Sequence, residues 1–307
     1  MWWTIALAAL LAVGTCPLPA GDHRRSVCVD GQRREYQVHV PRRDGPSRPL
    51  PVVLAFHGGG RHAEDMVWLT GLNRTADAHG FLAVYPQGSG PFRGMRTWNA
   101  GSCCAHAMRD QIDDVRFVEL LLDDLAQATP IDQQRIYATG FSNGAMLCHR
   151  LAAELPHRLA AIAPVAGSIA TRDAPMVPGV SVIHFHGTDD LNVPYHGGVG
   201  PRSFTKNDNV SVVDSIQMWV RLNQCDLAPT VECLPTAVND GTCVTRTAYQ
   251  GGVEGAEVAL ITIHGGGHTW PGGKDLGWYF GRTTRNISAN ELMWEFFQRH
   301  SKPEGMP

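Results

Sequence analysis

The residues best suited to do chemistry lie in four short segments along the chain. The clearest segment is Gly140-Phe141-Ser142-Asn143-Gly144, between a predicted strand, RIYAT, and a predicted helix, AMLCHRLAAE. In that setting G-x-S-x-G is typical of a nucleophile elbow, a turn so tight that glycine is needed on both sides of the serine. The helix N-terminus beneath the serine favours developing negative charge. Ser142 is therefore the candidate nucleophile, and a glycine-rich turn with a serine helix cap is the alternative.

The second segment, His57-Gly58-Gly59-Gly60, directly follows the apolar run PVVLAF. Such a turn lets backbone N–H groups point into a site at the end of the strand. An oxyanion would then be bound by the amides of Asn143 and of a residue near Gly59. The alternative is a flexible turn after a core strand.

The third and fourth segments supply acids and histidines. His186-Gly187-Thr188-Asp189-Asp190 follows the predicted strand VSVIHF, and HGGGHTWPGG follows the last predicted strand. A carboxylate on such a loop orients a histidine and stabilises its imidazolium. Asp189 and Asp190 compete for this role. His268 is the candidate general base, and His264 is its main rival.

The third segment also offers residues that could bind a metal ion. His184 and His186 alternate on one face of a strand with acids beyond, as zinc ligands can. The H-x-H-x-D-H spacing is lacking, and no further His/Cys cluster completes the set. We therefore expect no metal.

The chain order of the three groups indicates a class. Serine, then aspartate, then histidine is the order of α/β-hydrolases, and it differs from the trypsin-type and subtilisin-type orders. Four motifs at four strand ends in sequence are far less probable by chance than any one of them.

The elements that must position these groups alternate between strand and helix. Hydrophobic runs predict strands over 27–29, 36–40, 51–56, 81–85, 135–139, 159–165, 180–185 and 258–263. Helices are predicted over 70–79, 112–128, 144–154, 211–222 and 288–299. This alternation predicts an α/β fold with a mostly parallel central sheet, helices on both faces and an N-terminal antiparallel hairpin. We expect one catalytic domain over 21–307, in which 188–255 is a loop-rich insertion or a cap-like region.

Composition and the N-terminal residues limit the classes of protein to which this chain can belong. The chain has 307 residues, 43% of them hydrophobic, with a net charge of -3, which excludes the strongly basic footprint of a dedicated nucleic-acid binder. Residues 1–20 resemble a signal peptide, so we expect a secreted or periplasmic protein. The apolar run 5–13 is too short to cross a bilayer, and no other stretch is long enough. A lipid anchor at Cys16 and a retained helix are the alternatives.

Export would make the seven cysteines beyond Cys16 disulfide candidates. One pair is expected among Cys225, Cys233 and Cys243. The adjacent Cys103 and Cys104 are expected to pair with different partners. Cys148 lies on a predicted helix and is expected to be buried apolar filler. An odd number leaves one thiol free, unless Cys16 takes part.

Taken together, the motifs resemble a known family. HGGG followed by AEDM, TWNAGSCC, GFSNGA, HGTDDLNVPY and GGGHTWPGG are similar to secreted esterases related to polyhydroxybutyrate depolymerases and feruloyl esterases, including actinobacterial lipoprotein members. The resemblance runs from about residue 36 to residue 299. It implies an α/β-hydrolase fold, a serine-esterase mechanism and no cofactor.

The resemblance also assigns residues. It makes Ser142 the nucleophile, selects Asp190 as the acid and makes His268 the base. It implies an oxyanion donor at Gly59, where many relatives have cysteine, and a backbone donor needs no side chain.

Three aromatic side chains are candidate substrate contacts. Trp98, Trp270 and Tyr195 are expected to wall the pocket, and core packing is the alternative for each. Asp113 and Asp114 open a predicted helix and are expected to be structural.

The expected substrate is a feruloyl- or acetyl-type ester of the plant cell wall. Hydrolysis of a hydroxyalkanoate polyester is the alternative. A non-catalytic polymer-binding protein on a hydrolase scaffold is the alternative from another class. The sequence does not give the oligomeric state.

Overall fold

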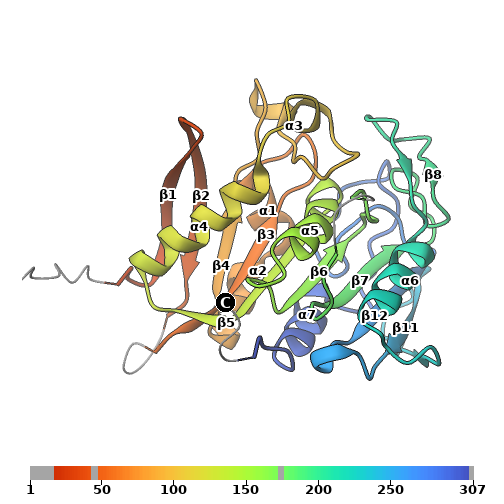
Figure 1. Cartoon of the computed structure of the whole chain (residues 1–307). Coiled ribbons are helices and arrows are strands. Elements are labelled where there is room, and N and C mark those ends of the chain that lie inside the picture. Colours follow the sequence, from red (N-terminus) through yellow and green to blue (C-terminus); the bar gives the residue numbers. More distant parts are fainter. Residues whose placement is uncertain (1–16, 43–47, 172–175, 304–307) are drawn as a thin grey trace, which may run out of the picture.

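A computed structural model describes residues 17–42, 48–171 and 176–303. The predicted leader up to residue 16, with Cys16, lies outside the described residues. The main feature is a ten-stranded sheet in the order β1-β2-β4-β3-β5-β6-β7-β12-β11-β10 (Figure 1). Its strands are β1 (Gly21–Val29), β2 (Gln32–Val40), β3 (Leu50–Phe56), β4 (Leu82–Pro86), β5 (Ile131–Phe141), β6 (Ala161–Val165), β7 (Ser181–Gly187), β10 (Thr230–Cys233), β11 (Cys243–Tyr249) and β12 (Val258–His264). Strands β8 (Gly198–Val199) and β9 (Asp208–Asn209) pair separately.

The middle of the sheet is parallel and its two edges are antiparallel. Strands β4, β3, β5, β6, β7 and β12 run parallel to their neighbours. At one edge, β2 of the β1–β2 hairpin pairs with β4 in antiparallel orientation. At the other edge, β11 pairs antiparallel with β12, and β10 pairs antiparallel with β11. The predicted mostly parallel sheet with a leading antiparallel hairpin is therefore confirmed. Every residue of β3 is buried, as expected for a strand covered on both faces.

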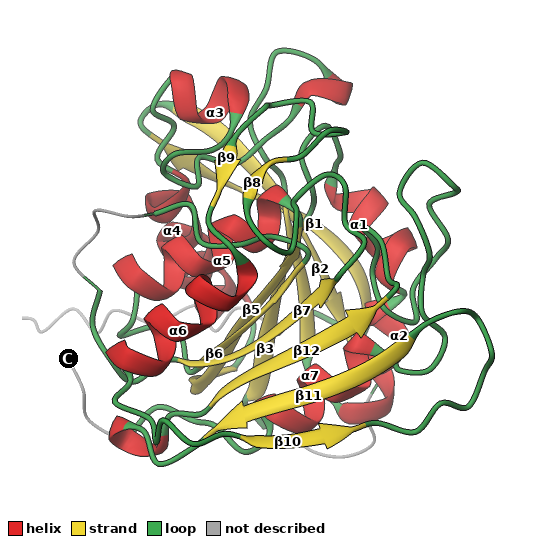
Figure 2. Cartoon of the chain, turned by 90° about the vertical axis from the view of Figure 1, so that its right-hand side faces the viewer, coloured by secondary structure: helices red, strands yellow, loops and turns green. Residues whose placement is uncertain are grey.

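Helices cover both faces of the sheet, as Figure 2 shows. The helices α4 (Asp114–Ala128), α5 (Asn143–Glu154) and α6 (Val212–Leu222) lie on one face, and α1 (Ala63–Thr70), α2 (Leu72–His79) and α7 (Ala289–Phe297) lie on the other. A short helix, α3 (Ala105–Arg109), stands outside these layers. Each face has its own buried apolar cluster, and the side chains of its three helices contribute to it. Burying apolar surface on both faces provides the main stabilisation of such a layered fold.

Some elements were predicted and others were not. The helix predicted over 70–79 is α2, and an unpredicted helix, α1, precedes it; Gly71, with φ of 61°, ends α1 and begins α2. Within 188–255 the predicted helix is α6, which covers the sheet. The edge strands β10 and β11 in that stretch were not predicted. The hairpin turn is confirmed at Asp30 and Gly31, which both have positive φ.

The cysteines also differ from expectation. Cys103 and Cys104 are paired with each other, so the prediction that they have different partners is wrong. Cys225, Cys233 and Cys243 all have free thiols, and the pair expected among them is not formed. Cys148 is free and fully buried in the cluster of α4, α5 and α6, as predicted. No helix in the described ranges is both long enough and apolar enough to cross a membrane.

Candidate active site

Ser142 lies on the sharp turn between β5 and α5. Its backbone has φ of 56° and ψ of -118°, a conformation that a non-glycine residue rarely adopts. The Ser142 N–H donates to the Val165 carbonyl, and the Ser142 carbonyl accepts from the Met146 N–H. The turn is thus fixed to a neighbouring strand and to the following helix. This is the strand, turn and helix context that a nucleophile elbow requires.

The glycines on both sides of the serine are required by close packing. A Cβ atom at Gly140 would lie 2.5 Å from the Gly144 backbone. A Cβ atom at Gly144 would lie 2.3 Å from the carbonyl oxygen of Phe56 on β3. Neither contact is possible without moving the backbone, so the sequence reasoning about these two positions is confirmed.

The loops after β7 and β12 lie against each other. A Cβ atom at Gly187 would lie 2.2 Å from the Gly266 carbonyl oxygen, and the Asp189 N–H donates to that same carbonyl. The His268 backbone N–H donates to Phe280, and the His268 ring packs on Phe141 with 4.8 Å between centroids. These contacts bring the acid loop and the histidine loop to the elbow.

The structure places the three predicted groups in hydrogen-bonding sequence. The distance from His268 Nε2 to Ser142 Oγ is 2.9 Å, and the distance from His268 Nδ1 to Asp190 Oδ2 is 2.6 Å. Asp190 and His268 are 2% and 3% exposed, so water does not compete for the bond between them. Ser142 is partly exposed and open to a substrate. This arrangement can activate the serine hydroxyl and store its proton on the imidazole.

The carboxylate of Asp190 is held by further donors. Its Oδ1 accepts from the backbone N–H groups of Asn192 and Val193, at 2.8 and 2.9 Å. Burial alone would raise the pKa of this carboxyl. The adjacent His268 and His186 lower it more strongly, so the net pKa lies below its usual range. Asp190 is therefore an anion at neutral pH.

The two rivals left open by the residue pattern lie elsewhere. Asp189 is exposed and accepts from the Thr188 hydroxyl. His264 is exposed at the end of β12 and bonds the Thr245 hydroxyl. The structure therefore brings Asp190 and His268, rather than these neighbours, to Ser142.

The predicted oxyanion donors lie together beside the serine. A Cβ atom at Gly59 would lie 3.8 Å from the Asn143 Cβ. Asn143 is the first residue of α5, where an N–H has no acceptor within the helix. The Gly59 N–H likewise has no acceptor within the parts of the chain that the structure describes. Both amides are available to a substrate oxyanion.

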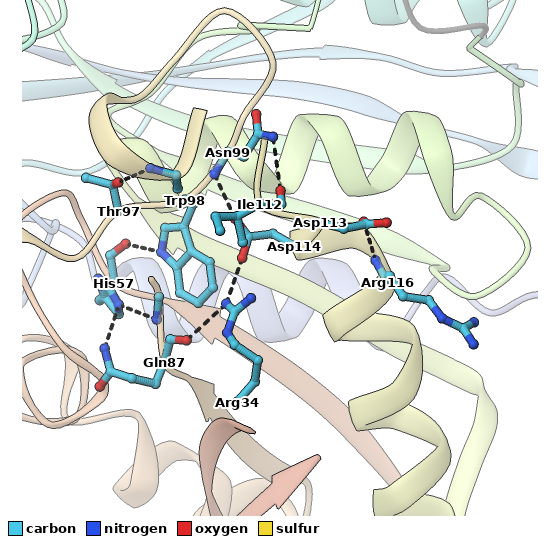
Figure 3. Close-up of polar contacts among 12 residues, drawn as sticks. Arg34, His57, Gln87, Thr97, Trp98, Asn99, Ile112, Asp113, Asp114 and Arg116 are labelled. Atoms are coloured by element: carbon cyan, nitrogen blue, oxygen red, sulfur yellow. Dashed lines mark hydrogen bonds and ion pairs between the residues drawn. The ribbon is translucent and has the colours of Figure 1, made fainter. Parts of the chain in front are cut away.

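Side chains that the sequence analysis did not assign hold this loop in place (Figure 3). The His57 ring donates from Nδ1 to the Gly58 carbonyl, and its Nε2 accepts from the Gly88 N–H and the Gln87 amide. Burial lowers the pKa of His57 to about 3, so the ring is neutral and keeps this tautomer. Its place at the start of the HGGG segment was the only signal in the sequence.

The Asn143 side chain joins the elbow to the segment that carries Trp98. Its Oδ1 accepts from the Trp98 N–H at 2.7 Å, and its Nδ2 donates to the Trp98 carbonyl at 3.0 Å. The Trp98 indole N–H in turn donates to the His57 carbonyl at 2.8 Å. One asparagine thus positions an oxyanion amide and is itself fixed by the neighbouring loop.

A buried ion pair lies behind Trp98, as Figure 3 shows. Arg34 on β2 and Asp114 at the start of α4 are 2.7 Å apart, and their side chains are 7% and 0% exposed. Asp114 Oδ2 also accepts from the N–H of Asn99, next to Trp98. Asp113 caps α4 by accepting from the Arg116 N–H. The structural interpretation of both aspartates agrees with this geometry.

Two of the three aromatic residues expected to wall the pocket are not placed as predicted. Trp98 and Trp270 are fully buried, and the Trp270 indole donates to Asn290 on α7. Both are core residues, so the prediction of pocket walls is wrong for them. Tyr195 is partly buried and its hydroxyl bonds Thr262, which turns its polar end towards β12.

A different set of side chains surrounds a small hollow next to the elbow. Its apolar lining consists of Met66, Trp68, Leu69, Phe141 and Leu276, and the rest of the lining is His57, Gly58, Arg61 and Asp65. Gly58 touches the elbow, since a Cβ atom there would lie 3.5 Å from the Ser142 Cβ. The Trp68 side chain is 52% exposed, so its indole is available to a ligand. Sequence reasoning missed Trp68 because it lies on α1, a helix that was not predicted.

The histidines weighed as zinc ligands bond to each other and to the backbone. His184 Nε2 is 3.1 Å from His186 Nδ1, and His186 Nε2 is 2.8 Å from the Val193 carbonyl. Among the residues that the structure describes, no group of three or more His, Cys, Asp or Glu side chains is arranged to hold a metal ion.

Comparison with known proteins gives a family and a fold. The family model described as esterase PHB depolymerase matches residues 35–226. The chain is 32% identical over 263 residues to the "Putative esterase NocK" of Nocardia uniformis subsp. tsuyamanensis, covering 81% of this chain and 74% of that protein. It is 31% identical to feruloyl esterase B of Piromyces equi, covering 80% of this chain and 44% of that longer protein.

Solved structures support the same architecture. An acetyl xylan esterase from Aspergillus awamori superposes with a TM-score of 0.62 at 16% identity, over 90% of this chain and 99% of that chain. At that identity the likeness establishes the fold, which is the α/β-hydrolase fold predicted from the motif order.

Proposed function

Because the chain belongs to the esterase PHB depolymerase family, whose members are carboxylic ester hydrolases, we propose that it acts as a serine esterase through Ser142. The observation that carries the proposal is the pair of distances joining Ser142, His268 and Asp190. The partners are ester substrates, and no step of the proposed reaction needs a cofactor.

The proposed mechanism is acyl transfer in two steps. His268 Nε2 takes the Ser142 proton as the serine oxygen attacks the ester carbonyl, and Asp190 stabilises the imidazolium that forms. The amides of Gly59 and Asn143 bind the oxyanion. His268 then protonates the leaving alcohol. Water, deprotonated by the same ring, attacks the acyl-enzyme and releases the acid.

The apolar hollow beside the elbow supports an aromatic acyl group as the substrate. Trp68 lines this hollow with a side chain that is 52% exposed, and a hydroxycinnamoyl ring would stack on the exposed face of its indole. We therefore propose feruloyl-type esters as the preferred class, with acetyl esters also accepted. The relative named feruloyl esterase B supports the same choice. A polyester is the second candidate. A related protein from Paucimonas lemoignei, which is 28% identical and covers 53% of this chain, is named poly(3-hydroxyalkanoate) depolymerase C.

A variant in the hollow tests the substrate class. Trp68→Ala should raise KM for methyl ferulate about fivefold, because a stacked ring is worth about 1 kcal/mol, and should leave acetate ester hydrolysis unchanged. Trp278→Ala is the matched control, since Trp278 is 84% exposed and does not line the hollow. Clearing of a hydroxyalkanoate film without methyl ferulate hydrolysis would favour the polyester instead.

The activity itself is tested at the serine. Ser142→Ala should abolish ester hydrolysis and leave the unfolding midpoint close to that of the wild type. Wild-type turnover in that variant would refute the assignment of Ser142 as the nucleophile, whereas absence of ester hydrolysis in the wild type would favour a non-catalytic binding protein on this scaffold.

Export remains a proposal that rests on residues 1–20 of the sequence. We infer that this leader directs the protein out of the cytoplasm. Fractionation of cells that express the full chain tests it: the protein should appear in the periplasm or the medium, and retention in the cytoplasm would contradict it. Labelling with a radioactive fatty acid would reveal an anchor at Cys16.

A further inference from the structure

Two histidines that the proposed mechanism does not use lie directly behind its acid. His184 and His186 alternate along β7, and both side chains are buried, at 0% and 1% exposure. His186 Nε2 is 3.4 Å from Asp190 Oδ2, the same oxygen that accepts from His268 Nδ1. The row continues to His149 on α5, whose ring stacks on that of His184 with centroids 5.6 Å apart.

The hydrogen bonds fix which nitrogen of each ring carries a proton. The Val193 carbonyl can only accept, so His186 Nε2 carries hydrogen. In a neutral ring His186 Nδ1 is then bare, and it accepts from His184 Nε2–H at 3.1 Å. At the far end the Trp219 indole can only donate, so His149 Nδ1, 2.9 Å away, is bare.

Protonation of His186 would break the hydrogen bond that it accepts from His184. A charged His186 would carry hydrogen on both nitrogens, and its Nδ1–H would then face the Nε2–H of His184. Burial lowers the pKa of His149 to about 3 and holds the pKa of His184 well below its usual range. His149 and His184 are therefore neutral rings, and His184 directs its Nε2–H at His186 without adding charge.

We propose that His186 is a positioning residue for the acid of the triad. Its Nε2–H donates to the Val193 carbonyl at 2.8 Å, and the same nitrogen, 3.4 Å from Asp190 Oδ2, turns the carboxylate so that Oδ2 faces His268 Nδ1. His184 acts one step further back, because its Nε2–H keeps His186 in the tautomer that donates towards the acid. The consequence for turnover rests on the proposed function, whereas the effect on the His268–Asp190 bond does not.

The closest experiment replaces His186 in two ways. His186→Phe keeps an aromatic ring and removes both nitrogens. We expect kcat to fall about 10- to 100-fold with KM nearly unchanged, since small misplacement of a catalytic group costs about that much. His186→Gln keeps a donor for Val193 and Asp190 and an acceptor for His184, and should restore kcat to within about threefold of the wild type. His264→Phe is the matched control on the exposed end of β12 and should behave as the wild type.

A spectroscopic measurement keeps the proposal testable if the phenylalanine variant folds poorly or if no ester is found. The proton between His268 Nδ1 and Asp190 should give a far-downfield proton resonance that disappears in His268→Ala. In His186→Gln it should keep its wild-type position, and in His186→Phe it should shift or broaden. In the nitrogen-15-labelled wild type, His186 should show a bare Nδ1.

Three results would overturn the proposal. They are wild-type kcat with an unmoved resonance in a folded His186→Phe variant, equal losses in the Phe and Gln variants, and a hydrogen on Nδ1 of His186 in the wild type. Absence of ester hydrolysis in the wild type would refute the proposed function alone, because the resonance would still report on the contact between His186 and Asp190.

Discussion

Two aspartates of this molecule are buried to almost the same extent, but their carboxylates contact different partners. Asp114 is fully buried and pairs with Arg34 at 2.7 Å. Asp190 is 2% exposed and faces the rings of His268 and His186. The first carboxylate supports the segment that fixes Asn143, the proposed oxyanion donor, and the second contacts His268, the proposed base.

The difference lies in the cation. A guanidinium keeps its proton at any physiological pH, so Arg34 always offers Asp114 a positive partner, which offsets part of the rise that burial causes in the pKa of Asp114. Asp114 in turn holds the loop of Trp98 and Asn99. In the proposed mechanism, by contrast, the imidazole of His268 takes up the serine proton and later gives it to the leaving alcohol. His268 then supplies Asp190 with a positive partner only while it holds the serine proton. Burial alone does not distinguish the two carboxylates; the partner that each one faces does.

The largest expected effect comes from removing the charge of Asp190. Asp190→Asn should lower kcat/KM about 10⁴-fold, because the amide no longer stabilises the imidazolium and favours the wrong tautomer of His268. Steady-state hydrolysis of methyl ferulate measures the loss. Asp189→Asn, at the exposed neighbouring position, should stay within about twofold of the wild type. Comparable losses in the two variants would contradict the assignment of the acid.

The next effect is on stability and comes from breaking the other buried pair. Arg34→Met leaves the Asp114 carboxylate without its cation, which should lower the free energy of unfolding by about 3–5 kcal/mol. Urea unfolding followed by circular dichroism measures it. Arg24→Met is the matched control, since Arg24 and Glu64 form an exposed pair on the surface and such pairs contribute about 1 kcal/mol or less.

Activity of the folded Arg34→Met protein sharpens the comparison. At temperatures well below its unfolding midpoint, the reaction should keep the pH dependence of the wild type, because the contact between Asp190 and His268 is untouched. A changed pH dependence would mean that the two carboxylates are coupled, and the division between a structural acid and a catalytic one would fail.

The smallest expected effect is on how steeply the free energy of unfolding changes with pH. Burial lowers the pKa values of His57 and His149 to about 3 from an ordinary value of 6.5. Below pH 6.5 the unfolded chain therefore binds protons that the folded chain does not, and stability falls as pH falls. Each such ring contributes up to about 1.4 kcal/mol per pH unit in this range. Unfolding free energies measured between pH 6.5 and about 5 should be less steep for His149→Gln than for the wild type. An equal slope would show that His149 is protonated in the folded protein.

The sequence predicted which three groups the structure brings together, because local constraints determine where they lie. A serine between Gly140 and Gly144 after a buried strand leaves few geometries, and the chain order of Ser142, Asp190 and His268 favours one fold. The choice of Asp190 over Asp189 needed the family resemblance. The structure supports that choice through burial and the Asn192 and Val193 donors, neither of which is visible in a sequence.

What the sequence did not predict depends on contacts between distant segments. Trp98 and Trp270 lie beside catalytic motifs along the chain, but Asn143 and Asn290 hold them in the core from other elements. The hollow beside Ser142 is walled instead by Trp68, on a helix whose apolar spacing is weak. The pairing of Cys103 with Cys104 runs against the expectation that adjacent cysteines have separate partners.

The central claim is that Ser142 is a nucleophile activated by His268. The most direct measurement is covalent labelling by a fluorophosphonate, followed by mass spectrometry of the intact protein and of its peptides. One label per chain is expected, on the peptide that contains Ser142, with rapid labelling in the wild type and labelling slowed at least about 10³-fold in His268→Ala. Labelling of another residue, or an equal rate in the two proteins, would contradict the account.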